Sequence, residues 1–446
     1  MKKMVKGELT VFLSLVFLLL ISLVTAVIQS AAIQVNKNEK RADASRAVES
    51  VFAEYHRMLM EDYGVPALDK TYATGSSADE NILNRLSYYG AENMEIRISG
   101  IQYLTDNLGS SFYEQAVKYE KEKKGMAGTD KILQYADQWE SRKTDTDDLN
   151  KELDKVREEL EQVSDGEQGE LKQLREFLSE KLLKLVVPGD FQMSDKKLTL
   201  SRLPSQRELN KGYGTLRPGQ KSAANPVFFN LYLSEKFGNA GRVRDKVLDY
   251  EQEYLLNGKG SDKKNLEETA RKIVNFRFGI NYLYLMTDEK KIAEAGAAAG
   301  IIAAAVLSPE SEPAVKTALL LTWAYAESVM DVRELLCGEK VPVDKTKENW
   351  KLTIGNLMKI KDTVSAGKPD EDKEGWDYST YLRVLLIMRG KQVLSMRALD
   401  LIEENIRLKG EPGFRADQMV SGAEFLMHCP VGIGVSYDFN SIYQYK

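Results

Sequence analysis

Twenty consecutive uncharged residues, from Leu9 to Ile28, constrain this chain more than any other feature of its sequence. As a helix rising 1.5 Å per residue, the stretch is about 30 Å long, which is the thickness of a bilayer's hydrocarbon core. Three lysines precede it, namely Lys2, Lys3 and Lys6. The sequence therefore predicts a single transmembrane anchor near the N-terminus, with its apolar side chains in the lipid bilayer of the cell membrane.

The residues expected to contact lipid are the apolar ones of this stretch. They are Leu9, Val11, Phe12, Leu13, Leu15, Val16, Phe17, Leu18, Leu19, Leu20, Ile21, Leu23, Val24, Val27 and Ile28. The alternative is a secretory signal cleaved at the small residues that end in Ala26. Because the apolar region of a signal usually runs only about 7 to 15 residues, the longer stretch here favours a retained anchor.

Basic residues flank the stretch on both sides, so the positive-inside rule gives no clear orientation. Those on the C-terminal side are Lys37, Lys40, Arg41 and Arg46, with Glu39 and Asp43 among them. Long C-terminal domains can cross a membrane despite such charges. We therefore expect Lys2, Lys3 and Lys6 to fix the N-terminus inside the cell and the bulk of the chain to be extracytoplasmic.

The helical pattern continues beyond the apolar stretch. Apolar residues recur at spacings of three and four, at Val48, Val51, Phe52, Tyr55 and Leu59. The first strong breaker is Gly64. The pattern predicts one helix from about Leu9 to about Asp62, half in lipid and half a stalk packed on a folded head.

Several segments carry a family resemblance: Lys6 to Leu15, Phe52 to Tyr55 with Tyr63 and Gly64, Asn281 to Asp288, and Trp323 to Ser328. They resemble an uncharacterised family of Gram-positive envelope proteins, a domain of unknown function whose members look like neighbours of tight-adherence (Tad) pilus and type II secretion machinery. The resemblance implies a pseudopilin-like N-terminus and a large extracytoplasmic region. The resemblance implies a location in the cell envelope and a connection with these assemblies, but it implies no catalysed reaction.

The resemblance also points to a possible processing site at Gly7 and Glu8. Prepilin peptidase cuts after a Gly that follows basic residues, and Gly7 follows Lys6. Pilins carry a Glu five residues after the cut, where this chain has Phe12, while Glu8 directly follows the Gly. Cleavage at Gly7 therefore stays open, and filament formation is less expected than cleavage.

Patterns along the chain predict an α+β fold that is mostly helical. The expected parts are an anchor with its cytoplasmic tip (1–36), a stalk helix with a first strand (37–109), a charged helical hairpin (110–210), a linker (211–225) and a helical core with C-terminal strands (226–446). Strands are expected at Met94 to Leu104, with a β-bulge at Gly100, and at Val420 to Cys429 and Val431 to Phe439. We expect them to meet in one small antiparallel sheet.

The charged region contains a heptad-like apolar seam typical of a coiled coil. Its two halves are Leu149, Leu153, Val156, Leu160 and Val163, and, after Asp165 and Gly166, Leu171, Leu174, Leu178, Leu182 and Leu185. Either the arms pack on each other within one chain or they dock a partner coiled coil. Each arm has fewer than three continuous heptads, which favours packing within the chain.

Four long helices are expected in the second half of the chain. They run from a Ser261 cap to Leu285, from Ile292 to Leu307, from Ala314 to Met330, and from Tyr378 to Leu408. Charged residues follow the apolar run of the third, namely Glu327, Asp331, Arg333 and Glu334. We interpret them as a solvated helix end, because Arg333 is not at pairing distance from Glu327 along the helix.

The sequence predicts no catalytic residue, no metal ligand and no cofactor. His56 lies on the stalk, and His428 adjoins Cys429 in a strand, where neighbours point to opposite faces. Cys337 and Cys429 form either a disulfide or two separate thiols, and the sequence favours the thiols. With 62 Lys and Arg against 67 Asp and Glu, no global positive field exists to bind nucleic acid.

The expected function is therefore that of a non-enzymatic, membrane-anchored extracytoplasmic protein, an accessory or minor pseudopilin-like component of a Tad-type pilus or secretion assembly. Its expected partners are the lipid bilayer and other pilin-like or secretion-assembly subunits. Two alternatives stay open. One is a secreted or surface hydrolase that uses scattered carboxylates about 5 to 9.5 Å apart. The other is a surface adhesin or glycan-binding module.

Overall fold

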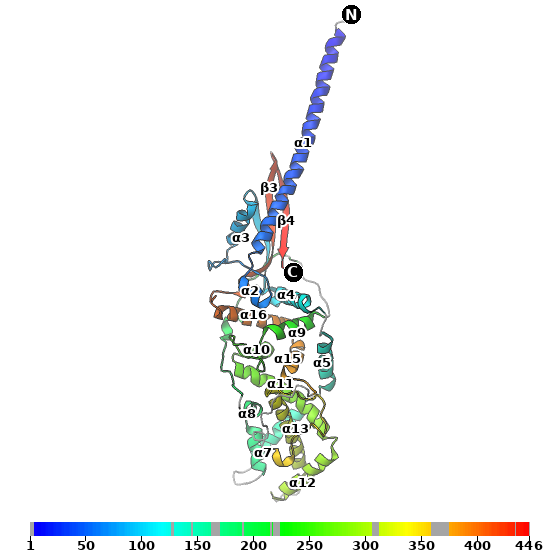
Figure 1. Cartoon of the computed structure of the whole chain (residues 1–446), viewed down its shortest axis with the longest axis vertical. Helices are drawn as coiled ribbons and strands as arrows, with labels where there is room; N and C mark the ends of the chain where they lie inside the picture. The colour runs from blue at the N-terminus through cyan, green and yellow to red at the C-terminus, as the bar shows by residue number, and fades with distance from the viewer. Residues whose placement is uncertain are drawn as a thin grey trace. The chain divides into compact units, whose positions relative to one another are not determined.

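A computed structural model describes residues 4–125, 129–143, 146–161, 170–189, 191–214, 216, 224–305, 312–357, 374–432 and 434–445. Within them the fold is α+β, mostly helical with one small antiparallel sheet, which confirms the predicted class (Figure 1). The chain divides into two compact units. Unit 1 comprises Met1–Gln115, Glu208–Gln220 and Glu411–Lys446, and unit 2 comprises Ala116–Arg207 and Lys221–Gly410.

Unit 1 is built on a four-stranded antiparallel sheet in which one strand pairs with all the others. This central strand is β3 (Met419–Gly432), and its partners are β1 (Leu68–Asp69), β2 (Glu95–Tyr103) and β4 (Val435–Gln444). Strands from distant parts of the sequence therefore meet, as predicted. The register of β2 shifts between Ile98 and Gly100, which confirms the predicted bulge.

One face of this sheet is covered by the C-terminal half of α1 (Met4–Phe52). The side chains of Ala47, Val51 and Phe52 are fully buried there, against Phe425 and Met427 of β3. The Phe52 ring also stacks on Tyr443 of β4, with 4.4 Å between the ring centroids. The apolar stripe at spacings of three and four is thus the face that the helix turns to the sheet.

The first helix is shorter than predicted, because it ends at Phe52 and not near Asp62. Tyr55 is extended and forms a β-bridge with Leu68. A separate helix, α2 (Arg57–Tyr63), starts after His56, whose ring nitrogen accepts the backbone N–H of Leu59 as an N-cap. The helical spacing of apolar residues continues past Phe52 in the sequence. The helix itself ends there, because the next residues pair with the sheet. Helix α3 (Asp79–Leu86) and a π-helical turn (Ser87–Ala91) follow.

The predicted strand from Val431 to Phe439 is wrong, since the chain reverses within it. Strand β3 ends at Gly432, β4 begins at Val435, and Gly434 between them has a left-handed backbone (φ 72°). Apolar and polar residues alternate along both arms of the hairpin, and the alternation continues through the turn. The pattern therefore looks like that of one continuous strand.

Unit 2 is helical. Helix α4 (Asp106–Lys124) has its second half in this unit, and the other helices that the structure describes there are α5 (Thr129–Arg142), α6 (Asp147–Glu161), α7 (Glu170–Ser179), α8 (Leu182–Val186), α9 (Asn225–Lys236), α10 (Glu251–Asn257), α11 (Asp262–Leu285), α12 (Glu289–Ala305), α13 (Glu312–Leu336), α15 (Tyr378–Ile387) and α16 (Lys391–Leu408). Short 3₁₀ turns lie at Leu200–Arg202 and Ile354–Asn356 in this unit and at Ala416–Gln418 in unit 1. The Ser261 hydroxyl caps α11 by accepting the N–H of Lys264, as predicted. Helices α11 and α13 pack side by side.

The expected helix from Tyr378 to Leu408 is broken at Gly390, whose extended backbone (ψ 130°) separates α15 from α16. The seam residues Leu153, Leu160, Leu174 and Leu178 are buried within the chain, where α6 contacts both α7 and α13. This confirms packing within the chain for the two arms. Val163, the Asp165–Gly166 turn and the side chain of Leu171 lie outside the described residues.

Candidate functional site

The apolar half of α1 is the first candidate site. The helix is long and apolar enough to cross a membrane, and no described residue covers its most apolar segment. All the predicted lipid-contacting side chains are exposed except Val16, which is half-buried, and Leu19 is 67 % exposed. An exposed apolar surface of this extent on a folded protein marks an interaction with lipid or protein.

The polar groups of this half are satisfied internally. The hydroxyls of Ser14, Ser22 and Thr25 donate to backbone carbonyls one turn earlier in the same helix. Such bonds remove the cost of placing a hydroxyl in lipid. Gly7 and Glu8 lie on the exposed first turns of α1, whereas Lys2, Lys3 and the side chain of Lys6 lie outside what the structure describes.

A buried cluster of charged side chains lies between α11 and α13 in unit 2. Arg277 of α11 donates from Nε to Asp331 of α13 over 2.9 Å, and both side chains are fully buried. Lys345 Nζ lies 2.6 Å from Glu327 Oε1 and 2.9 Å from Asp331 Oδ1. Lys351 pairs with Glu334 at the edge of the cluster. Three cations thus face three carboxylates.

This cluster corrects the interpretation of a solvated helix end. Glu327, Asp331 and Arg333 are buried, and Glu334 is mostly covered. Their partners come from elsewhere in the sequence: Arg333, for example, donates to the backbone carbonyl of Leu185 over 3.1 Å. The sequence did hold a signal, because Glu327 and Asp331 are four residues apart and therefore share one face of an apolar helix. Two acids on such a face require cations from another segment.

The cluster fastens the segment from Val341 to Leu352 onto the helix pair. Glu327 accepts the backbone N–H groups of Lys351 and Leu352, and Arg277 donates to two carbonyls of the same segment. Burial alone would raise the pKa of Asp331, but the charges of Arg277 and Lys345 outweigh it and hold that pKa well below its ordinary value. With the carboxylate oxygens engaged in this way, the arrangement is suited to holding structure rather than to binding a metal ion.

A second group of buried acids lies around α10. Glu253 accepts from the Ala240 N–H and the Tyr378 hydroxyl, and Glu251 accepts from Gly238 and Asn405. Burial raises the pKa of Glu253 to about 7. Its carboxyl group therefore titrates near neutral pH, which makes this part of unit 2 sensitive to pH.

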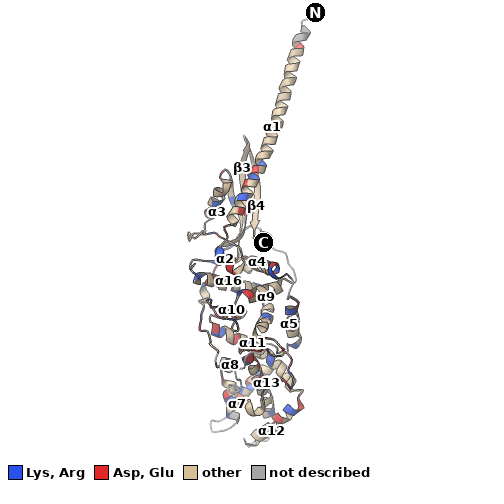
Figure 2. Cartoon of the chain, in the orientation of Figure 1, with Lys and Arg blue, Asp and Glu red and all other residues tan. Residues whose placement is uncertain are grey.

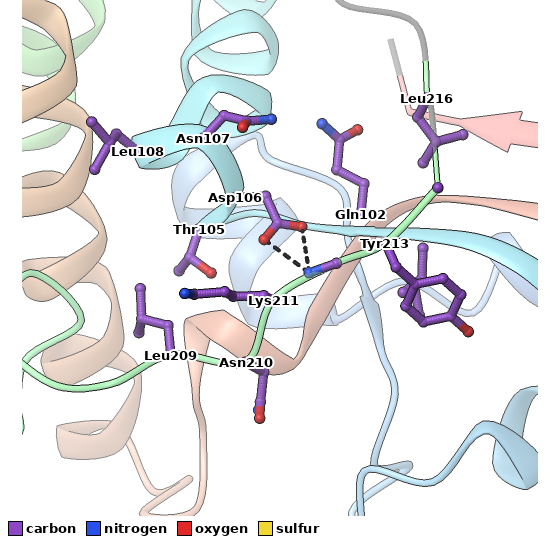
Figure 3. Close-up of a pocket in the computed structure, with 13 residues that line it drawn as sticks. Gln102, Thr105, Asp106, Asn107, Leu108, Leu209, Asn210, Lys211, Tyr213 and Leu216 are labelled. Carbon is purple, nitrogen blue, oxygen red and sulfur yellow. Dashed lines mark hydrogen bonds between the residues drawn. The ribbon is translucent and has the colours of Figure 1, made fainter.

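Unit 1 contains a pocket of about 680 Å³ where β2 meets the start of α4 (Figure 3). Both oxygens of Asp106 accept the Gly212 N–H, at 3.0 and 3.1 Å, and one of them also accepts the Tyr103 N–H. The Thr105 hydroxyl is buried and has no hydrogen-bond partner among the described residues. In Figure 3 it points to the same part of the pocket as the Lys211 ammonium group.

This pocket is walled by residues that the sequence assigns to a linker. Residues 211–214 are ordered against the sheet, with Tyr213 forming a two-way bridge with Ile101 at 2.9 and 3.0 Å. A Cβ on Gly212 would lie 2.2 Å from the Ile101 carbonyl oxygen. The glycine is therefore required for close approach to β2, and not for flexibility.

Neither this pocket nor one in unit 2 offers the unengaged pair of acids that the hydrolase alternative needs. Asp106 is the sole acid among the lining residues of the first. A pocket of about 580 Å³ formed by α6, α7, α8, α11 and α13 has the acids Asp154, Glu180 and Glu267 in its lining, and each of these acids faces a cation. Among the described residues, no group of three or more His, Cys, Asp and Glu side chains is placed to hold a metal ion.

The histidines and cysteines do not meet. His56 bonds Glu411 over 2.6 Å, and exposed His428 bonds Asp438 of the neighbouring strand. Cys429 is buried on the opposite face from His428, as predicted. Cys429 belongs to unit 1 and Cys337 to unit 2, and no disulfide joins them.

Comparison with curated proteins finds no match, and comparison with solved structures finds none. Comparison with protein families matches residues 161–430, more than half of the chain, to a family of unknown function. The match contains both groups of buried charged residues and leaves α1 outside. The chain therefore belongs to this family, DUF5702.

Proposed function

We propose that this protein is a non-enzymatic, single-pass membrane protein with an extracytoplasmic bulk, and that it acts as an accessory or minor pseudopilin-like component of a Tad-type pilus or secretion assembly. The observation that carries the proposal is the division of α1. Its first half is apolar and bare, while its second half packs on an antiparallel sheet. A pseudopilin-like subunit needs this division, because one helix must serve both the membrane and the head.

The anchor works through burial of apolar surface. Each CH₂ group moved from water to lipid contributes about 0.8 kcal/mol, so a stretch of this length is an effectively permanent tether. Within the bilayer, bare helices of neighbouring subunits associate through van der Waals packing. The sheet of unit 1 is then held at a fixed distance from the membrane, since α1 is continuous from the apolar half to the sheet.

Fractionation of cells with protease shaving tests the anchor and its orientation. We expect the full-length protein in the membrane fraction, with the head degraded by protease added to intact cells stripped of their wall. Leu19→Arg, at the centre of the apolar stretch, should weaken insertion, because Arg there costs about 2.5–3.5 kcal/mol. Leu408→Arg is the matched control, since Leu408 is 65 % exposed on unit 2. Uncleaved wild-type protein free in the cytosol would contradict the proposal.

Mass spectrometry of the membrane-purified protein tests the pseudopilin-like part. If prepilin peptidase processes the chain, the mature protein begins at Glu8, and Gly7→Val leaves the precursor intact. Gly413→Val is the control for a glycine substitution elsewhere in unit 1, because a Cβ at Gly413 would meet nothing within 4 Å. A mature N-terminus directly after Ala26 would instead identify a cleaved signal and overturn the anchor.

A further inference from the structure

The tip of the β3–β4 hairpin lies against α1 at the point where its uncharged stretch ends. The Asn36 side-chain amide donates to the Val431 carbonyl over 2.9 Å, and Lys37 Nζ lies 4.7 Å from the centre of the Tyr437 ring. A Cβ on Gly432 would lie 3.3 Å from Ile33. The tip and this part of α1 therefore form one surface within unit 1 (Figure 1).

The length of the uncharged stretch places this surface relative to a bilayer. No charge occurs between Glu8 and Lys37, and Figure 2 shows the next charges of α1 beside β3 and β4. At 1.5 Å per residue, the stretch from Leu9 to Asn36 is about 42 Å long. A bilayer with its headgroup layers is about 40–45 Å thick. When Leu9 to Ile28 span the hydrocarbon core, Ile33 lies about 8 Å beyond it along α1, so the contact with the hairpin tip lies at the outer edge of the headgroup layer.

The chemistry of this surface suits anionic headgroups. Lys37, Lys40 and Arg41 make no ion pair with any residue that the structure describes, whereas Arg46, further along α1, pairs with Asp43. The tip adds exposed Val435 and the Tyr437 ring, which stacks on Phe439. Lysine, arginine and tyrosine at this level are typical of residues that face the membrane–water interface.

We propose that the β3–β4 hairpin tip is a second membrane contact, which inserts Val435 into the headgroup layer while Lys37, Lys40 and Arg41 bind the phosphates of anionic lipids. The inference rests on the proposed anchoring by α1. Two contacts prevent the sheet of unit 1 from rotating relative to the membrane, so the sheet keeps a fixed orientation to it. The sequence alone did not point to this role, because the tip lies inside the segment predicted as one continuous strand.

A tryptophan placed at the tip tests the contact in full-length protein reconstituted into vesicles of phosphatidylcholine and phosphatidylglycerol with brominated acyl chains. After subtraction of the wild-type signal, emission from Val435→Trp should be quenched by the brominated lipid. Ile442→Trp is the matched control: Ile442 lies on the same strand, is 60 % exposed, and is about 23 Å from Val435 along β4. We expect no quenching there.

The basic residues are tested by charge removal in the Val435→Trp protein. Lys37→Gln, Lys40→Gln and Arg41→Gln together should abolish the extra quenching seen when phosphatidylglycerol is added to phosphatidylcholine. Arg46→Gln, which removes an exposed cation already paired with Asp43, should leave it unchanged. Equal quenching of Val435→Trp with and without phosphatidylglycerol would overturn the headgroup assignment.

Flotation of the same vesicles separates this inference from the proposed function. Protein that floats with the vesicles while Val435→Trp is quenched no more than Ile442→Trp would overturn the second contact and leave the anchor standing. Protein that does not float at all would overturn the anchor and the inference with it.

Discussion

Asn36 and Val431, which are 395 positions apart, are joined by a 2.9 Å hydrogen bond from the side-chain amide to the backbone carbonyl. The bond fixes the hairpin tip to α1 just before its first charged residue after the apolar stretch. Two further contacts join the tip to the same part of α1: Lys37 Nζ lies over the Tyr437 ring, and Gly432 lies close to the Ile33 side chain.

Asn36→Leu should loosen the hairpin tip without unfolding unit 1. Losing a hydrogen bond of this kind costs about 0.5–1.5 kcal/mol. Hydrogen–deuterium exchange of the peptide that covers the turn between Gly432 and Val435 should therefore become faster. Asn38→Leu, at an exposed position two residues later, should leave exchange at the tip unchanged. Equal acceleration in both variants would mean that the Asn36 bond does not hold the tip.

Lys345→Met should strongly destabilise unit 2, because it leaves the buried carboxylates of Glu327 and Asp331 without their shared cation. Breaking a buried ion pair from one side costs about 3–5 kcal/mol. Urea unfolding of the detergent-solubilised chain, followed by tryptophan fluorescence, measures the free energy of unfolding. Lys155→Met removes a surface pair and should cost less than about 1 kcal/mol. Similar losses in the two variants would contradict a structural role for the cluster.

The stability of unit 2 should fall between pH 5 and pH 8, with Glu253 as one cause. Its pKa is raised by burial to about 7 from an ordinary 4.5, so the folded state holds the proton more tightly than the unfolded state does. The resulting stabilisation is complete below about pH 4.5 and is lost as the pH rises through 7, at a total of about 3 kcal/mol.

Glu253→Gln keeps a neutral side chain at every pH and should flatten this slope. Part of the slope remains, because burial also raises the pKa of Glu251, Asp262 and Asp400. Urea titrations at pH 5 and pH 8 measure the difference. The exposed Glu159→Gln serves as the control, and a slope unchanged by Glu253→Gln would rule out its contribution.

Gly212→Ala should displace the segment that walls the unit 1 pocket from β2. The added methyl group would sit 2.2 Å from the Ile101 carbonyl oxygen, which is backbone and cannot move aside cheaply. We expect the backbone amides of Ile101 and Tyr213 to lose protection from hydrogen exchange. Gly413→Ala, with nothing within 4 Å of the added carbon, is the control in the same unit. Retained protection in Gly212→Ala would show that the bridge tolerates a side chain.

Features set by local pattern were predictable from the sequence. The apolar stretch of α1, the cap at Ser261 and the bulge at Gly100 all follow from residues close together in the chain. The hairpin turn could not be predicted, because apolar and polar residues alternate in both arms without interruption. The sequence pattern therefore gives no sign that the chain reverses at Gly434.

The buried charges could not be predicted because their partners are distant in sequence. Glu327 is neutralised by Lys345, which belongs to a segment without regular structure, and Asp331 by Arg277 of another helix. A search for pairs within one helix misses both. The pocket could not be predicted for a related reason. In the sequence Gly212 is typical of a flexible linker, and its close packing against the backbone of β2 depends on a contact between distant segments.

The sheet of unit 1 also sets an order of events during synthesis. Ser99 of β2 bonds to the backbone of Glu424, 325 positions later, and unit 2 is encoded in between. The apolar face of α1 and the edges of β2 thus emerge from the ribosome long before β3 and β4 exist to cover them. All of unit 2 is synthesised before β3 and β4, which complete unit 1. Until then the nascent chain exposes the apolar face of α1 and the unpaired edges of β2, and this surface must be protected from aggregation.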